Sequence, residues 1–182
     1  MSKIYKALIL VICLIAISFV VVGKETTING KQAMREINKE QVAIDKYFKD
    51  SNFANKDKEV KWQEYYNIKK ELFNLSPTKD TIRIICKTLK AVAIAQTLNR
   101  EDILAWQYNN IGKEIINVYI ITPPEHRVEL YDLMVYGLKC MEIANQVDLK
   151  LPKDKKVTIK RNLEFLKTAT YGIKLEGETN GK

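Results

Sequence analysis

The segment AWQYNNIGKEII, residues 105–116, places a tryptophan, a tyrosine, two asparagines and a glycine in a stretch that otherwise favours a helix. Tyr108, Ile111 and Ile115 recur at spacings of three and four residues, which is the period of an amphipathic helix. Glycine inside a helix costs about 1 kcal/mol relative to alanine, so Gly112 needs a structural reason. A closely packed second helix supplies one, because glycine has no side chain to hold two backbones apart. We expect Gly112 to be a packing residue and not part of a functional site.

The same helical period continues along the chain after Gly23, and no stretch alternates apolar and polar residues as a half-buried strand would. Ser76-Pro77 and Thr122-Pro123 each mark a helix start, since a hydroxyl caps a helix and proline suits its first position. Asn99, which precedes two acidic residues, marks another start. The pattern predicts an all-α fold of six helices with short connections, at about 31–49, 57–75, 77–98, 100–118, 123–144 and 153–171.

Residues 1–23 have the layout of an export signal or of an N-terminal membrane anchor. The basic start MSKIYK precedes ALILVICLIAISFVVVG, residues 7–23, a run of 17 residues without a charge. This run is slightly long for a cleaved signal peptide and close to the lower limit for a bilayer-spanning helix. Cleavage or anchoring would both place the rest of the chain on the periplasmic or extracellular side of the membrane. We expect a helical domain over residues 24–174 and a disordered tail over 175–182.

The charge of the chain is positive but diffuse. Lysine and arginine number 30 against 22 acidic residues, which gives a formal net charge of +8, and 25 of the basic residues are lysine. Nucleic-acid interfaces favour clustered arginine with interleaved aromatic residues, and the sequence has no run of more than two basic residues. Nucleic acid is therefore not an expected partner.

Motifs for catalysis, nucleotide binding and metal binding are absent from the sequence. It has one histidine, His126, and none of GxGxxG, GxxxxGK[ST], HExxH or GxSxG occurs. We therefore predict a non-enzymatic protein with no catalytic residue, no cofactor and no metal site. An envelope hydrolase is an alternative, and it would have to use His126 as its only imidazole.

Two cysteines, Cys86 and Cys140, follow the N-terminal segment, and both lie in apolar helical runs. An exported protein can join such a pair in a disulfide, whereas an unpaired cysteine in this setting behaves as a small buried apolar residue. The apolar surroundings favour buried thiols, and the disulfide stays an alternative.

Two pairs of segments repeat along residues 57–147. LKAVAIAQTLN, which begins at Leu89, resembles LKCMEIANQVD, which begins at Leu138. WQEYYNIKKEL, from Trp62, resembles WQYNNIGKEI, from Trp106, when one residue is gapped. Each pair would form the matching helices of two hairpins. Repeated helical hairpins that bury their faces against one another are typical of an α-solenoid.

The second hairpin resembles a tetratricopeptide repeat. In the first helix of that repeat an aromatic residue is followed by a large apolar residue, a glycine and another large residue. The corresponding residues are Tyr108, Ile111, Gly112 and Ile115, and small residues of the second helices match at Ala95, Gly137 and Ala144. The resemblance implies antiparallel hairpins stacked as a short solenoid, whose first helices line a concave surface.

On that concave surface the resemblance implies six partner-binding residues: Gln63, Tyr66, Lys70, Asn109, Lys113 and Ile116. Their amide and ammonium groups suit hydrogen bonds to an extended, acidic peptide. We therefore expect an exported or membrane-anchored scaffold that binds a protein or an acidic peptide. The alternative is a structural helical bundle that self-associates through Trp62, Tyr65 and Tyr66.

Overall fold

The computed structural model describes residues 28–153 and 159–180. In these two ranges all regular structure is helical, which confirms the predicted all-α class and the six α-helices. The elements are α2 (Gly30–Asp50), the 3-10 segment η1 (Phe53–Asn55), α3 (Lys58–Phe73), α4 (Thr81–Thr97), α5 (Glu101–Ile121), the 3-10 segment η2 (Pro124–Leu130), α6 (Tyr131–Lys150) and α7 (Lys160–Asn180). The predicted signal or anchor, residues 1–23, lies outside the described ranges. No helix within them is long and apolar enough to cross a membrane.

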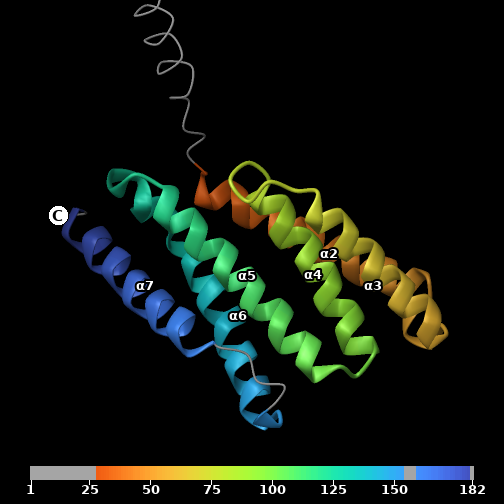
Figure 1. Cartoon of the computed structure of the whole chain (residues 1–182). Helices are drawn as coiled ribbons and strands as arrows, with labels where there is room; N and C mark the ends of the chain where they lie inside the picture. Colours follow the sequence, from red (N-terminus) through yellow and green to blue (C-terminus); the bar gives the residue numbers. More distant parts are fainter. Residues whose placement is uncertain (1–27, 154–158, 181–182) are drawn as a thin grey trace, which may run out of the picture.

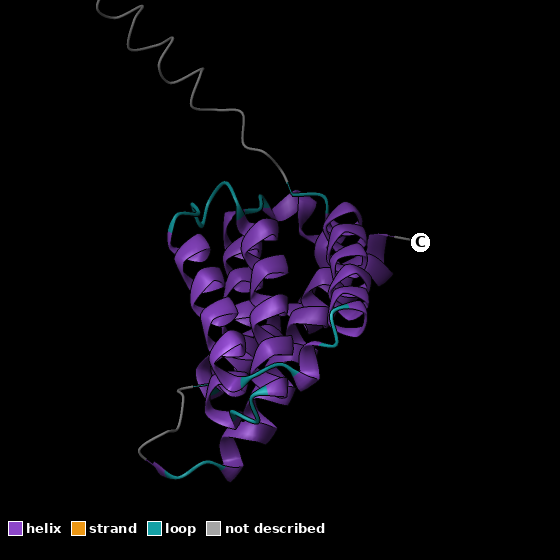
Figure 2. Ribbon diagram, turned by 90° about the vertical axis from the view of Figure 1, so that its right-hand side faces the viewer, coloured by secondary structure: helices purple, strands orange, loops and turns teal. Residues whose placement is uncertain are grey.

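The helices from α3 to α7 run up and down in sequence order, and each packs against the next (Figure 1). The turned view shows the helices side by side, joined by loops (Figure 2). α7 also contacts α5, the helix two before it. α2 departs from this order, because it packs against α4 and α6 and makes few contacts with α3, the next helix in the sequence. The hairpins therefore share a common core with α2 instead of stacking only on their sequence neighbours.

Two glycines let α5 and α6 pack closely. A methyl group at Gly112 of α5 would lie 2.6 Å from Cγ of Met141, and one at Gly137 of α6 would lie 2.9 Å from Cγ2 of Ile115. Ala144, one turn beyond Met141, is fully buried in the same core. The predicted packing role of Gly112 is confirmed. The glycine lowers the helix propensity of α5 but makes room for a large side chain from its partner helix.

The first of the described helices, α2, is held at its N-terminal end by a second close approach. Asn29 caps the helix, since its side-chain oxygen accepts a hydrogen bond of 3.0 Å from the Gln32 backbone N–H. A methyl group at Gly30 would overlap the Glu129 carbonyl oxygen and would lie 2.9 Å from the Leu130 Cα. The backbone of α2 thus meets the backbone at the end of η2, and this close approach needs a residue without a side chain.

Three predicted helix boundaries differ from the structure. Pro77 lies in a turn before α4, because the Ser76 N–H donates to the Asp80 carboxylate (3.0 Å) and the Asp80 N–H donates back to the Ser76 carbonyl (2.8 Å). Asn99 ends α4 instead of capping α5: it is left-handed, with φ of 52°, and the following N–H bonds back to Ala95. Thr122 closes α5 by donating its hydroxyl to the Val118 carbonyl (2.7 Å), and a 3-10 segment precedes α6.

The last helix also differs from its prediction. α7 begins at Lys160 and continues through Asn180, so residues 175–180, expected to be disordered, are helical. The physical reason is packing along its C-terminal half. Ile173 is buried, and Gly177 lies against Val128 of η2. A helix that buries such a face extends beyond the limit that its sequence pattern suggests.

Two clusters of buried side chains make up the core. The larger joins α2, α4, α5, α6 and α7. The smaller lies where η1, α3 and α4 meet, and its buried members are Phe53, Tyr65, Ile68, Ala91, Ile94 and Leu98. α3 contributes the buried Tyr65 and Ile68 to this cluster, with Trp62 and Leu72 packed against it, and no side chain to the larger cluster. α3 therefore packs on α4 through the smaller cluster, and a surface between α3 and α5 is left open.

Candidate functional site

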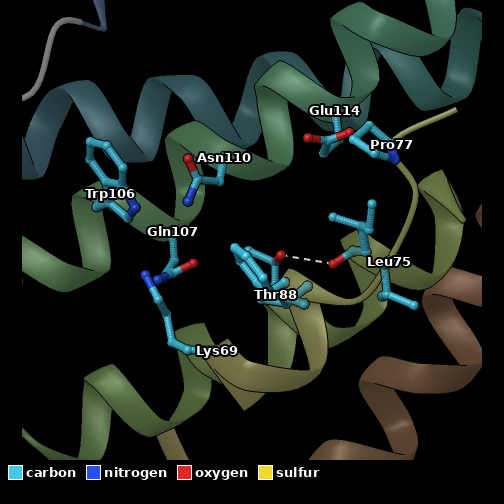
Figure 3. A pocket seen from close by; sticks show the side chains of 11 residues that line it. Lys69, Leu75, Pro77, Thr88, Trp106, Gln107, Asn110 and Glu114 are labelled. Atoms are coloured by element: carbon cyan, nitrogen blue, oxygen red, sulfur yellow. Dashed lines mark hydrogen bonds between the residues drawn. The ribbon is translucent and has the colours of Figure 1, made fainter. Parts of the chain in front are cut away.

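A groove of about 360 Å³ lies between α3 and α5, with α4 as its floor. We call it the α3–α5 groove. Figure 3 shows that Trp106, Gln107, Asn110 and Glu114 follow one another along α5, with Lys69 on the opposite wall. The full lining is Lys69, Leu72, Phe73, Leu75, Pro77, Ile84, Thr88, Trp106, Gln107, Asn110 and Glu114.

The groove exists because α3 and α5 separate beyond one point of contact. At that point the Gln107 amide of α5 donates a hydrogen bond of 2.7 Å to the Tyr65 hydroxyl of α3, and both side chains are buried. Along the next two turns of α3, Leu72 is only half-buried and Phe73 is almost fully exposed. The space between the helices is therefore open to solvent near the C-terminal end of α3.

Two large aromatic side chains border the groove and are open to solvent. Phe73 is 91% exposed, and Trp106 on the opposite wall is 47% exposed. Side chains of this size are usually buried in a monomeric protein. Exposed aromatic residues on facing walls are typical of a surface that a partner covers.

The polar lining of the groove combines neutral and charged groups. The Thr88 hydroxyl of the floor is satisfied within its own helix, since it donates a hydrogen bond of 2.7 Å to the Ile84 carbonyl. Burial raises the pKa of the Glu114 carboxyl, and its hydrogen bond from the Asn117 amide and the nearby Lys113 ammonium oppose that rise. The carboxyl is thus less readily ionised than an exposed one.

The ammonium group of Lys69 is the available charge of the α3 wall. The acidic neighbours of Lys69 along α3 are engaged by α4: Glu71 pairs with Lys87, and Glu64 accepts a hydrogen bond of 2.6 Å from Lys90. Lys69 forms no ion pair with any residue that the structure describes. Because this positive charge has no acidic counterpart among the described residues, it is free to attract an acidic partner.

The six predicted binding residues do not line this groove. Gln63, Tyr66 and Lys70 lie on the exposed side of α3, and Lys113 is exposed on α5. None of them is among the lining residues. On α3 the lining starts one position earlier than Lys70, at Lys69, and a shift of one residue turns a helical side chain by about 100°.

Two of the predicted residues face the opposite flank of α5. Asn109 is 4% exposed, and its side-chain oxygen accepts a hydrogen bond of 3.1 Å from the Asn162 amide of α7. Ile116 is 9% exposed and belongs to the larger core cluster. The resemblance to a tetratricopeptide repeat predicts an open concave surface on this flank, whereas α7 covers it. Gln107 and Asn110, which do line the groove, belong to the same segment, residues 105–116, but stand on its other side.

The aromatic patch proposed for self-association is only partly on the surface. Tyr65 is buried beneath its neighbours, and Trp62 is half-buried under the Arg100 guanidinium, 5.2 Å from the ring centroid. Tyr66 stacks on Trp62 with 5.7 Å between ring centroids and is the exposed member of the three. A self-association surface would therefore have to be formed chiefly by Tyr66 and the groove beside it.

The remaining chemical groups lie away from the groove. His126 is exposed in η2, with its Nδ1 3.3 Å from Glu129 Oε1. Cys86 and Cys140 are both free thiols, and burial raises their pKa to about 11 and about 12, so both are protonated at neutral pH. Within residues 28–153 and 159–180 no three His, Cys, Asp or Glu side chains are grouped to hold a metal ion. The prediction of a non-enzymatic protein stays a prediction.

Comparison with family models, with curated proteins and with solved structures gives no match for this chain. The resemblance to tetratricopeptide repeats stays a prediction based on the sequence pattern. The function is therefore argued from the groove itself.

Proposed function

We propose that this chain is a non-enzymatic scaffold that binds a protein, through an acidic segment with apolar side chains, in the α3–α5 groove. We further propose that the chain is exported or anchored to a membrane through residues 7–23. The observation that carries the binding proposal is the exposure of two aromatic residues, Phe73 on the α3 wall and Trp106 on the α5 wall, beside the uncompensated charge of Lys69.

The aromatic pair supports binding through apolar contact. Burying a phenylalanine side chain that is otherwise exposed stabilises a complex by about 1.5–3 kcal/mol. Phe73 is almost fully exposed in the free protein, so a partner that buries it would gain nearly all of this free energy. Tryptophan residues are enriched among the few residues that dominate binding energy, which favours Trp106 as the second anchor.

The charges favour an acidic partner. The chain carries a formal net charge of +8. Glu64 and Glu71 of α3 are paired with lysines of α4, whereas Lys69 is free of ion pairs within the described residues. An incoming carboxylate at this position gains a charge-assisted hydrogen bond without displacing an existing partner.

Site-specific photo-crosslinking in cells of the source organism tests the binding proposal. We expect p-benzoylphenylalanine in place of Phe73 to give a discrete adduct, because this side chain borders the groove. The matched control carries the same group in place of Val42, which is 69% exposed on α2 and outside the groove. The adduct at position 73 should disappear when Lys69→Glu is added.

Two outcomes of the crosslinking decide between functions. Equal adduct patterns at positions 42 and 73 would contradict the groove as a binding site. An adduct between two copies of the chain would favour the self-associating bundle. For the localisation, cell fractionation with protease accessibility and mass spectrometry of the N-terminus distinguish an exported, an anchored and a cytosolic chain.

A further inference from the structure

We infer that the partner presents an acidic amphipathic α-helix of about three turns to the α3–α5 groove. The inference rests on the proposed function, because it names the kind of partner that this groove takes. Four features of the described residues support it: the way α7 covers the other flank of α5, the stripe along α3, the backbone of the groove walls and the charges around it.

The flank of α5 away from the groove shows how another helix packs against α5. α7 lies against α5 and α6 there (Figure 1). Its Asn162 amide donates to the Asn109 side chain (3.1 Å), and its Phe165 ring packs edge-on against Tyr119, 5.9 Å between centroids. One amide pair and one aromatic pair thus join α7 to α5.

The groove flank of α5 carries groups of the same kinds with no helix against them. Trp106 supplies an aromatic ring, and Asn110 supplies an amide one turn further along. Both line the groove, on the α5 wall opposite Lys69 (Figure 3). A helix laid here would meet α5 as α7 does, on the opposite side.

A stripe of side chains along α3 has the spacing and length of a helix-packing face. Trp62, Tyr66, Lys69 and Phe73 stand at i, i+4, i+7 and i+11, and all but the half-buried Trp62 are exposed. This is the spacing at which side chains line one face of a helix and form the ridges that a second helix fits. The eleven steps along the helix from Trp62 to Phe73 span about 16 Å, or three turns.

The walls of the groove favour a helix over an extended segment. A chain bound against an apolar surface must satisfy its own backbone N–H and C=O groups. The walls are α-helices whose backbone groups bond within the helix, so they offer no strand edge for an extended peptide. A helix satisfies its backbone internally and needs only side-chain contacts from the groove.

The charges favour a helix from an acidic protein over a second copy of this chain. Lys69 lines the groove, and Lys70 and Lys113 are exposed on α3 and α5 outside the lining. Glu114 is the acidic residue of the groove lining, and burial raises the pKa of its carboxyl, so it opposes an acidic partner less than an exposed carboxylate would. Two copies with a net charge of +8 each would repel, whereas glutamates or aspartates that flank an apolar face would meet these lysines.

Selection of a library of random 20-residue peptides on the full-length chain tests the inference. We expect the enriched peptides to carry apolar residues at i, i+3 or i+4, and i+7, with acidic residues beside them. The affinity of the leading peptide, measured by fluorescence anisotropy, should fall by about tenfold or more with Phe73→Ala and with Lys69→Glu. Val42→Ala, an exposed apolar position outside the groove, should leave it unchanged.

Controls separate the inference from the proposed function. Proline in the middle of the leading peptide should abolish binding, because proline breaks a helix. Enriched peptides that depend on Phe73 but tolerate this proline would overturn the helical partner and leave the groove as a binding site. If the selection yields no peptide whose affinity depends on Phe73 or Trp106, both proposals fail. Unchanged thermal unfolding of each variant shows that the loss of binding is not a loss of fold.

Discussion

The close packing of α5 on α6 gives a stability prediction whose sign depends on the tertiary structure. Gly112 and Gly172 both stand inside long α-helices, so alanine at either position gains about the same helix propensity, ~1 kcal/mol. The two sites differ in their surroundings. A methyl group at Gly172 meets nothing within 4 Å, whereas one at Gly112 would lie 2.6 Å from Cγ of Met141.

The expected magnitudes follow from these contacts. Gly172→Ala should stabilise the protein by up to ~1 kcal/mol. Gly112→Ala makes the same gain but must displace Met141, and overpacking of this kind typically costs ~1–3 kcal/mol. Its net effect should lie between neutral and ~2 kcal/mol destabilising, because the methionine side chain is flexible. Gly112→Leu adds more volume at the same place and should be more destabilising than Gly112→Ala.

Urea unfolding of the full-length variants, followed by far-ultraviolet circular dichroism, measures both effects. For a chain of this size each kcal/mol corresponds to a shift of about 2–4 °C in Tm, which gives an independent check. Met141→Ala removes the clashing side chain, so in that background Gly112→Ala should become as favourable as Gly172→Ala. The packing argument fails if Gly112→Ala in the otherwise unchanged protein stabilises as much as Gly172→Ala does.

Three further predictions concern other sites. Gly30→Ala should destabilise by ~1–3 kcal/mol, because the new methyl group meets backbone that cannot rotate away, and thermal unfolding measures this. Burial raises the pKa of Glu114 above its unfolded value, so the folded state binds more protons between the two values and stability falls as pH rises through them. Glu114→Gln should flatten that slope in urea titrations from pH 4 to 8 and should raise stability at neutral pH; an unchanged slope would contradict this. The hydrogen bond from Arg100 lowers the pKa of Asp102 to about 2, so its contribution is present above the ordinary pKa of an aspartate and is lost as pH falls toward 2. Asp102→Asn should therefore weaken the fall in stability between about pH 4 and pH 2, as acid unfolding will show.

The sequence pattern alone was sufficient for the class of fold and for the number of helices. Apolar residues that recur every three or four positions bury one stripe of each helix, and this signal is local. It also predicted the packing role of Gly112, since a glycine inside a strongly helical segment lowers stability unless a neighbouring helix needs the space. The helix ends were less well predicted. Ser76-Pro77 and Thr122-Pro123 suit helix starts, yet hydrogen bonds such as that from Ser76 to the Asp80 carboxylate hold the chain in other turns.

Only the tertiary structure decided which flank of α5 is open. A helix has two flanks of similar composition, and amides and large side chains occur on both flanks of α5. α7 covers the flank with Asn109 and Ile116, although about fifty residues separate α7 from these positions in the sequence. The position of α2 against α4 and α6 likewise depends on the backbone contact at Gly30, between segments about a hundred residues apart. Such long-range contacts leave no periodic signal in a single sequence, and they left Trp106 uncovered on the other flank of α5 and Phe73 uncovered on α3.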